Sequence, residues 1–232
     1  MGKEFWIKCE RKDEEELLNK YVKRDKNYPV VWITWYDAIE FCNKLNKKEN
    51  LPIAYDNKGN MLDCNGKKTE DITKVKGYRL LTRAEWEYAA RGGIKSKGYR
   101  YSGSNNLNEV SWNSENSKDD VIHNVGLKKP NELGIYDMTG NVAEMCTDYL
   151  WSYIKNINPV GLKYSEKINC FPGNAGATSR ITKGNGEFDE KYEIGTNSWI
   201  EDKNRKEEQE ENSYDMGIRN GFTGFRIGKI AD

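Results

Sequence analysis

Two helices with clear start signals stand out in the pattern of apolar and polar residues. Residues 28–33 (Tyr-Pro-Val-Val-Trp-Ile) are rich in β-branched and aromatic side chains, which is typical of extended structure. Thr34 followed by Asp37 is a capping sequence and predicts that a helix begins here. Apolar residues then recur at helical spacing, and we expect them to face the core: Ala38, Ile39, Phe41, Cys42 and Leu45.

The second helix follows a short predicted strand at residues 78–81. Its start is a capping box, Thr82-Arg83-Ala84-Glu85, in which the threonine and the glutamate each bind the other's backbone amide. Gly92-Gly93 predicts its end, because glycine accepts the left-handed conformation that terminates helices. The apolar face of this helix is expected to comprise Trp86, Ala89 and Ala90. The acidic run at residues 13–18 predicts one further, charged helix start.

The remainder of the chain is dominated by turn-forming residues. Residues 105–120 are dense in Asn, Ser and acids, and beyond Gly140 short β-like pieces alternate with Gly- and Asn-rich turns. Residues 201–211 form a highly charged run that is typical of a surface insertion. There is no internal repeat and no interdomain linker. The sequence therefore predicts one α+β domain.

Composition changes this picture little. Charged residues make up 32% and hydrophobic residues 36%, but the 12% aromatic content favours a folded core over disorder. Lys+Arg and Asp+Glu both number 37, so the net charge gives no reason to expect nucleic acid or an anionic membrane as partner. A net charge of zero does not exclude a local basic patch on the surface.

No segment has the length and apolarity of a membrane span, and residues 1–6 contain no apolar signal run. We expect a cytoplasmic protein as the sequence stands. If an N-terminal leader was removed, the cell surface or the periplasm is expected instead.

The five cysteines are spaced poorly for a zinc site or a disulfide framework. None forms a Cys-x-x-Cys pair and their number is odd. We expect reduced thiols, some of them packed in the core. They are Cys9, Cys42, Cys64, Cys146 and Cys170.

Five stretches, in this order, resemble the sulfatase-modifying-factor family of formylglycine-generating enzymes. They are Tyr28-Pro29-Val30 with residues 35–45, residues 78–93, residues 113–117, residues 125–144, and Gly224-Phe225-Arg226-Ile227. The resemblance implies a C-type-lectin-like fold, with two helices packed on short antiparallel sheets and much irregular loop. It implies that residues 28–232 form the domain and that residues 1–27 are a shortened N-terminal segment of it.

The resemblance also implies one structural calcium ion. In this family Asp-x-x-Gly-x-Val-x-Glu marks a bound calcium, with side-chain oxygens from the two acids and carbonyls from the Gly and Val. Here these residues are Asp137, Gly140, Val142 and Glu144. Independently of the family, Ca²⁺ prefers six to eight oxygen ligands, and a tight glycine turn lets carbonyls converge beside carboxylates. The alternative is a turn whose acids cap backbone amides.

The catalytic part of the family pattern is missing. Active members oxidise a substrate cysteine with a copper ion held by two cysteines, which follow an Arg-Val-x-Arg-Gly-Gly-Ser-Trp-like element. The counterpart here is residues 180–188, and no cysteine follows it, because Cys170 is the last cysteine of the sequence. Cu(I) needs sulfur ligands, whereas the residues that follow this element include Asp189, Glu190, Tyr192 and Glu193. We therefore expect no copper, and the only histidine, His123, is expected to be an ordinary polar loop residue.

The leading hypothesis is a non-catalytic binding module on a calcium-stabilised scaffold, with a protein or glycan as ligand. Function in such folds resides in loops carried by a rigid scaffold, and Trp, Tyr and Arg dominate binding surfaces. The candidate ligand-binding residues lie in the C-terminal part: Phe188, Tyr192, Asn197, Trp199, Tyr214, Arg219 and Phe222. One alternative is the variable binding protein of a diversity-generating retroelement, since those proteins resemble the same fold and vary near a Gly-Phe-Arg element. The other is an oxidase that acts on a cysteine peptide.

Overall fold

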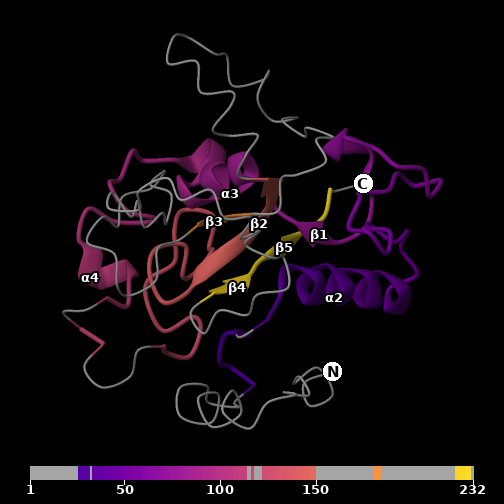
Figure 1. Cartoon of the computed structure of the whole chain (residues 1–232). Coiled ribbons are helices and arrows are strands. Elements are labelled where there is room, and N and C mark those ends of the chain that lie inside the picture. The colour runs from indigo at the N-terminus through magenta and orange to yellow at the C-terminus, as the bar shows by residue number, and fades with distance from the viewer. Residues whose placement is uncertain are drawn as a thin grey trace, which may run out of the picture.

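The computed structural model describes residues 26–31, 33–113, 116–117, 122–149, 180–183 and 223–230 (Figure 1). The predicted start at residues 13–18, and the insertion at residues 201–211, lie outside these. The helical elements are α2 (Trp35–Lys48), α3 (Arg83–Ala90), α4 (Leu107–Val110) and the 3₁₀ turns η1 (Ile72–Lys74) and η2 (Gly93–Lys95). The strands are β1 (Arg79–Leu80), β2 (Ala143–Tyr149), β3 (Arg180–Lys183), β4 (Thr223–Phe225) and β5 (Ile227–Gly228).

Helix α2 begins and faces the core as its sequence predicts. The Thr34 hydroxyl accepts the Asp37 amide at 3.0 Å, and the Asp37 carboxylate accepts the Thr34 amide at 2.8 Å, so the capping box is complete. Ala38, Ile39 and Cys42 are buried. One residue of the buried face is polar: Asn46, which the apolar pattern does not include, is fully buried. Its amide donates to the Tyr78 carbonyl and accepts the Tyr78 N–H, which joins α2 to the start of β1.

Helix α3 also follows its predicted capping box. Thr82 and Glu85 bind each other's backbone amides, Trp86 and Ala90 are buried, and Gly92 has φ +85° just beyond the helix. Because residues with a side chain rarely adopt this left-handed conformation, the glycine allows the chain to turn directly after α3.

Two local predictions are modified. Residues 105–120 were expected to be loop, yet Leu107–Val110 forms the short helix α4, whose cap is the Asn106 side chain. In the extended segment at 28–33, none of the described residues belongs to a named strand. Its buried residues Tyr28, Val31 and Ile33 nevertheless add to the core.

The strands form two small sheets, β1–β5 and β3–β2–β4. β1 pairs antiparallel with β5, and β3 antiparallel with β2, as predicted. β4 instead runs parallel to β2. Figure 1 shows these strands at the centre, with α2 on one side and α3 on the other. Helix α2 packs against β1 and α3 against β2. The predicted α+β, C-type-lectin-like architecture is therefore confirmed.

The main core joins α2 to the strands. It contains the buried side chains of Trp35, Tyr55 and Leu80, with Phe225 packed against it. Trp35 also donates its indole N–H to the Cys146 carbonyl in β2 at 3.2 Å, so the polar edge of a buried ring is satisfied. In the part of the chain that the structure describes, no helix combines the length and apolarity that crossing a membrane requires.

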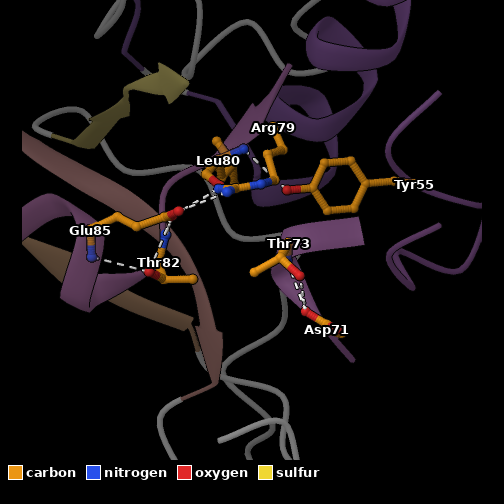
Figure 2. Close-up of polar contacts among 7 residues, drawn as sticks. All are labelled: Tyr55, Asp71, Thr73, Arg79, Leu80, Thr82 and Glu85. Carbon is orange, nitrogen blue, oxygen red and sulfur yellow. Dashed lines mark hydrogen bonds and ion pairs between the residues drawn. The ribbon is translucent and has the colours of Figure 1, made fainter. Parts of the chain in front are cut away.

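A polar network supports β1 beneath this core (Figure 2). Arg79 is buried, and its guanidinium makes two hydrogen bonds to the Glu85 carboxylate, at 2.8 and 2.7 Å. The Tyr55 hydroxyl accepts the Leu80 N–H at 3.1 Å. Burial acts to raise the pKa of Glu85, but the hydrogen bonds and charge of Arg79 and the bonds from Thr82 outweigh it and lower that pKa.

We predict that Asn46→Ala destabilises the fold strongly. The substitution leaves the N–H and C=O of Tyr78 without their partner, and each buried unsatisfied group costs roughly 1–3 kcal/mol. Urea denaturation should show the free energy of unfolding lowered by about 2–5 kcal/mol. Lys47→Ala, on the exposed side of the same helix, should change it by no more than about 0.5 kcal/mol. Equal effects of the two variants would contradict the role of Asn46.

We predict that Glu85→Gln removes a stabilisation that depends on pH. Since the folded-state pKa of Glu85 is below its ordinary value, the ion pair stabilises the fold fully above the unfolded-state pKa and is lost as pH falls through the folded-state value. Glutamine keeps an acceptor for the cap. The difference in urea midpoint between wild type and variant should be largest at neutral pH and shrink toward about pH 3.

The matched control is Glu40→Gln, which removes an exposed ion pair to Lys44 within α2. Its difference from wild type should be small at every pH. A Glu85→Gln difference that stays constant from neutral to acid pH would show that the charge of Glu85 contributes nothing.

Candidate functional site

The C-terminal strands place Arg226 against the first residues of β2. Gly224, in β4, lies so close to the chain at Val30 that an added Cβ would stand 2.7 Å from the Val30 carbonyl oxygen. This close approach places β4 beside β2, with Gly224 opposite Glu144. Arg226 follows β4 directly, and its side chain reaches back to the same glutamate.

Glu144 is the centre of this arrangement. Its Oε1 accepts Nη2 of Arg226 at 2.6 Å, and its Oε2 accepts Nε of Arg226 at 2.8 Å. The same Oε2 accepts the indole N–H of Trp86 at 2.7 Å. Arg226 also donates to the Tyr136 carbonyl at 3.0 Å. We call the group of Trp86, Glu144 and Arg226 the carboxylate clasp; it joins α3, β2 and the C-terminal strands.

The charges in the clasp compensate one another. The Glu144 side chain is only 7% exposed, so its carboxylate needs a partner of opposite charge. Burial opposes the charge on Arg226, yet Glu144 beside it raises the pKa of the guanidinium. The two opposite charges thus lie in direct contact, 2.6 Å apart at the closest atoms.

Asp137 lies at the margin of the clasp and is less well compensated. Burial raises the pKa of its carboxyl, and the negative charge of Glu144 raises that pKa further. The hydrogen bond from the Gly126 N–H, at 2.7 Å, and the positive charge of Arg226 lower the pKa in part. The balance leaves the pKa of Asp137 above its ordinary value. This carboxylate would therefore gain from a further cation.

Three of the four predicted calcium residues, Asp137, Gly140 and Val142, lie in the turn that leads into β2, and the fourth, Glu144, lies in β2 itself. Asp137, Gly140 and Asn141 all have left-handed φ values, of +57°, +78° and +62°, and the chain then enters β2 through Val142. Gly140 packs directly on Ser111 and on the Trp112 carbonyl, where no side chain fits. The turn is rigid, and it sets Asp137 close to Glu144.

The donor set fits calcium only in part. Asp137 and the Gly140 and Val142 carbonyls are hard oxygen donors of the kind that Ca²⁺ binds. The carboxylate of Glu144, in contrast, already has nitrogen donors on both oxygens. Among the described residues there is no group of three or more His, Cys, Asp or Glu that could hold a metal ion. A calcium ion would therefore be held by Asp137 and the turn carbonyls, and its presence stays a prediction.

His123 is less exposed than a surface-loop residue was expected to be. It is half-buried, its ring stacks on Trp112 with centroids 3.8 Å apart, and its backbone N–H and C=O both bind the Asn141 side chain. Lys128 Nζ lies 3.9 Å from the centroid of the Trp112 ring. His123 thus helps to fix the loop that precedes the Asp137 turn.

The described cysteines are core or surface thiols. Cys42 and Cys146 are buried and Cys64 is exposed, and none of these three forms a disulfide, while Cys9 and Cys170 lie outside the described residues. Burial raises the pKa of the Cys42 thiol to about 12, so it remains protonated. Because the thiolate is the form that binds metals and attacks electrophiles, Cys42 is unsuited to copper or redox chemistry.

The seven predicted ligand-binding residues lie outside the described residues, in segment 184–222. The structure does place the two ends of this segment. Lys183, at the end of β3, pairs with Glu144, and Thr223, at the start of β4, pairs with Ala143. Segment 184–222 therefore leaves and rejoins the sheet at the same end of β2, beside the carboxylate clasp.

Sequence reasoning did not find the clasp. Arg226 and Glu144 were each noted as part of a matching stretch, but nothing along the sequence links two residues so far apart. The available signal was chemical: an acid in β2 and an arginine flanked by the apolar residues Phe225 and Ile227 require a partner when buried.

Comparison with known proteins agrees with this architecture. The model of the sulfatase-modifying factor enzyme 1-like domain matches residues 4–230. Chaperone protein LppX of Paenibacillus barcinonensis is 44% identical over 52% of this chain and 52% of its own length. Inactive C-alpha-formylglycine-generating enzyme 2 of Mus musculus is 30% identical over 69% of this chain and 44% of its own length. The chain spans about half the length of these curated relatives.

Two solved structures share the fold. Treponema denticola variable protein 1 superposes with a TM-score of 0.59 at 30% identity, covering 87% of this chain and 70% of its own. CarF superposes with a TM-score of 0.61 at 24% identity, covering 89% and 69%. On the extent of the family match and the shared fold, the chain belongs to the family of sulfatase-modifying factor enzyme 1-like domains.

Proposed function

We propose that this chain is a non-catalytic member of its family that binds a partner protein through segment 184–222. The observation that carries the proposal is the anchoring of both ends of that segment at one end of β2. Neighbouring strands lie about 4.8 Å apart, so the ends on either side of β2 are separated by roughly 10 Å. A segment that departs and returns at one fixed place is suited to presenting side chains from a scaffold.

The carboxylate clasp supports this presentation. Arg226 lies three residues beyond Thr223, where the segment rejoins the sheet, and Glu144 is the residue that pairs with Lys183, where it departs. The bidentate ion pair thus ties the return of the segment to the strand from which both its ends are held. Rigid anchoring lowers the entropy that binding must overcome.

The composition of the segment suits a protein partner. Trp199, Tyr214 and Arg219 belong to the three residue types that contribute most at protein interfaces. Phe188, Tyr192, Asn197 and Phe222 add aromatic and amide groups to the same stretch. The 44% identical relative is named as a chaperone protein, and a chaperone acts on another protein. This favours a protein over a glycan as ligand.

One observation supports the alternative that the chain is the variable protein of a diversity-generating retroelement. The 30% identical structure is named as a variable protein, and the Gly224-Phe225-Arg226 element here closes the proposed binding segment. A near-copy of the 3′ end of the gene nearby in the genome, differing at adenines, would identify the chain as such a protein. The absence of such a copy would count against this alternative.

The oxidase alternative has less support, since no cysteine follows Cys170 in the stretch where the family's copper ligands occur. Incubation with copper and a sulfatase-motif peptide, followed by mass measurement of the peptide, would reveal such an activity.

The proposal includes one structural calcium ion near the clasp. Asp137 would supply a carboxylate oxygen, and Gly140 and Val142 would supply carbonyl oxygens. The support is the left-handed turn, which directs hard oxygen donors to one place, and the buried carboxyl of Asp137, whose pKa burial raises above its ordinary value. Bound there, the ion would stabilise the turn that leads into β2.

We predict that partner binding requires the aromatic and arginine side chains of segment 184–222. Immobilised wild type should retain a protein from host lysate or cell-surface extract, and the variant Trp199→Ala, Tyr214→Ala, Arg219→Ala should lose it, because these types dominate interface energies. The variant's melting temperature should establish that it is folded.

The matched control carries three alanines at exposed positions of the turns before η1, namely Lys58→Ala, Asn65→Ala and Lys67→Ala. It should retain the partner. A protein held equally by wild type and both variants would place the binding surface elsewhere, and no retained protein at all would count against a protein ligand.

We predict that free Ca²⁺ raises the melting temperature of wild type and that Asp137→Asn abolishes the increase. Asparagine keeps an acceptor for the Gly126 N–H but removes the charge that the ion requires. By mass action, the stabilisation should grow with the logarithm of free calcium once the site is saturated. A wild-type melting temperature that a chelator leaves unchanged would exclude calcium from this scaffold.

A further inference from the structure

An exposed apolar surface lies where α3 ends. Three residues contribute to it: Tyr88 of α3 is 48% exposed, Ile94 of η2 is 89% exposed, and Leu133 is 36% exposed. A Cβ added to Gly93 would stand 3.2 Å from both the Tyr88 ring and the Leu133 side chain, so these two side chains meet over Gly93, next to Ile94. We call Tyr88, Ile94 and Leu133 the α3 patch.

The backbone beneath the α3 patch is held firmly. The N–H of Lys95 binds the Gly92 carbonyl at 2.9 Å, which closes the η2 turn, and the N–H of Lys97 binds the Glu132 carboxylate at 2.9 Å. The Asn131 side chain donates to the Ala89 carbonyl at 2.8 Å, and so joins the loop before Leu133 to the end of α3. A large aliphatic side chain such as Ile94 is therefore presented to solvent by a fixed turn.

The exposed charged side chains next to the α3 patch in sequence are basic. Arg91, Lys95 and Lys97 are exposed, and neither lysine forms an ion pair within the part of the chain that the structure describes. The neighbouring acids face inward. Glu132 binds the Lys97 backbone through one oxygen, and its other oxygen is buried against Gly92. Glu87 pairs with Arg83 along α3.

We propose that the α3 patch docks an acidic, apolar segment of a partner protein. Apolar side chains of that segment would cover Ile94, Tyr88 and Leu133, and its carboxylates would meet Arg91, Lys95 and Lys97. The tyrosine and the fixed turn limit the entropy lost on docking, and the basic rim selects an acidic partner and speeds its approach. This surface is separate in sequence from segment 184–222, so the inference does not rest on the function proposed above.

The test uses short fluorescein-labelled peptides in three matched sets. The first set places Leu and Tyr among Glu, the second replaces Glu by Gln, and the third replaces Glu by Lys. Fluorescence anisotropy measures their binding to the full chain. The Glu set should contain binders whose affinity falls with added salt, and the Gln and Lys sets should bind more weakly by about tenfold or more.

Two variants locate the binding. Ile94→Asn should weaken the Glu peptides by about tenfold or more, and it should leave the fold intact, since the side chain is almost fully exposed. The double variant Lys95→Glu, Lys97→Glu should also weaken binding of the Glu peptides by about tenfold or more, because it places negative charge opposite their carboxylates. Lys58→Glu with Lys67→Glu makes the same charge change at a distant turn and should have no comparable effect.

The proposal is overturned if no Glu peptide binds more tightly than its Gln counterpart, or if Ile94→Asn binds as wild type does. Displacement of the peptides by anionic lipid vesicles, at matched charge, would overturn it in favour of a membrane surface. The Trp199→Ala, Tyr214→Ala, Arg219→Ala variant should bind the peptides normally; a loss there would contradict a separate surface.

Discussion

The hydrogen bonds and charge that Glu144 receives from Arg226 and Trp86 are the constraint on which the position of the C-terminal strands against β2 and α3 depends. A carboxylate this deeply buried is tolerated only with a cation and donors in place. A buried ion pair of this kind adds little net stability compared with apolar packing, but breaking it leaves an uncompensated charge. The ion pair therefore contributes to specificity: it forms in one position of β4 against β2, and other positions would leave a buried charge without its partner. Gly224, packed on the Val30 carbonyl, enforces the same position by steric means.

That position has consequences for the molecule's chemistry. The clasp, the left-handed turn at Asp137 and the two ends of segment 184–222 all meet at the first residues of β2. The stabilising interactions that the structure describes there come from residues on either side of the segment. A scaffold of this kind separates the residues that fold the chain from those available to contact a partner.

How much of the structure was predictable depended on how local each interaction is. The starts of α2 and α3 were predicted correctly because Thr34 with Asp37, and Thr82 with Glu85, bind each other three residues apart. Asn46 was missed because a buried Asn is explained only by Tyr78, far along the chain. The parallel pairing of β4 with β2, and the ion pair that accompanies it, depend on residues more distant still. No rule of sequence spacing relates such distant residues, so only the types of side chain indicated that these contacts exist.

The same reasoning bears on the proposed binding role. Catalysis by a metal thiolate needs sulfur ligands whose pKa is low, and the thiol of Cys42 has the opposite environment, a core in which burial holds its proton. Two carboxylates, one in β2 and one in α3, are matched within the protein: Glu144 pairs with Arg226, and Glu85 pairs with Arg79. Groups that are fully matched stabilise a surface but are poor acids, bases or nucleophiles. At the α3 patch, in contrast, Ile94 is exposed, and Lys95 and Lys97 form no ion pair within the described residues; such groups suit recognition.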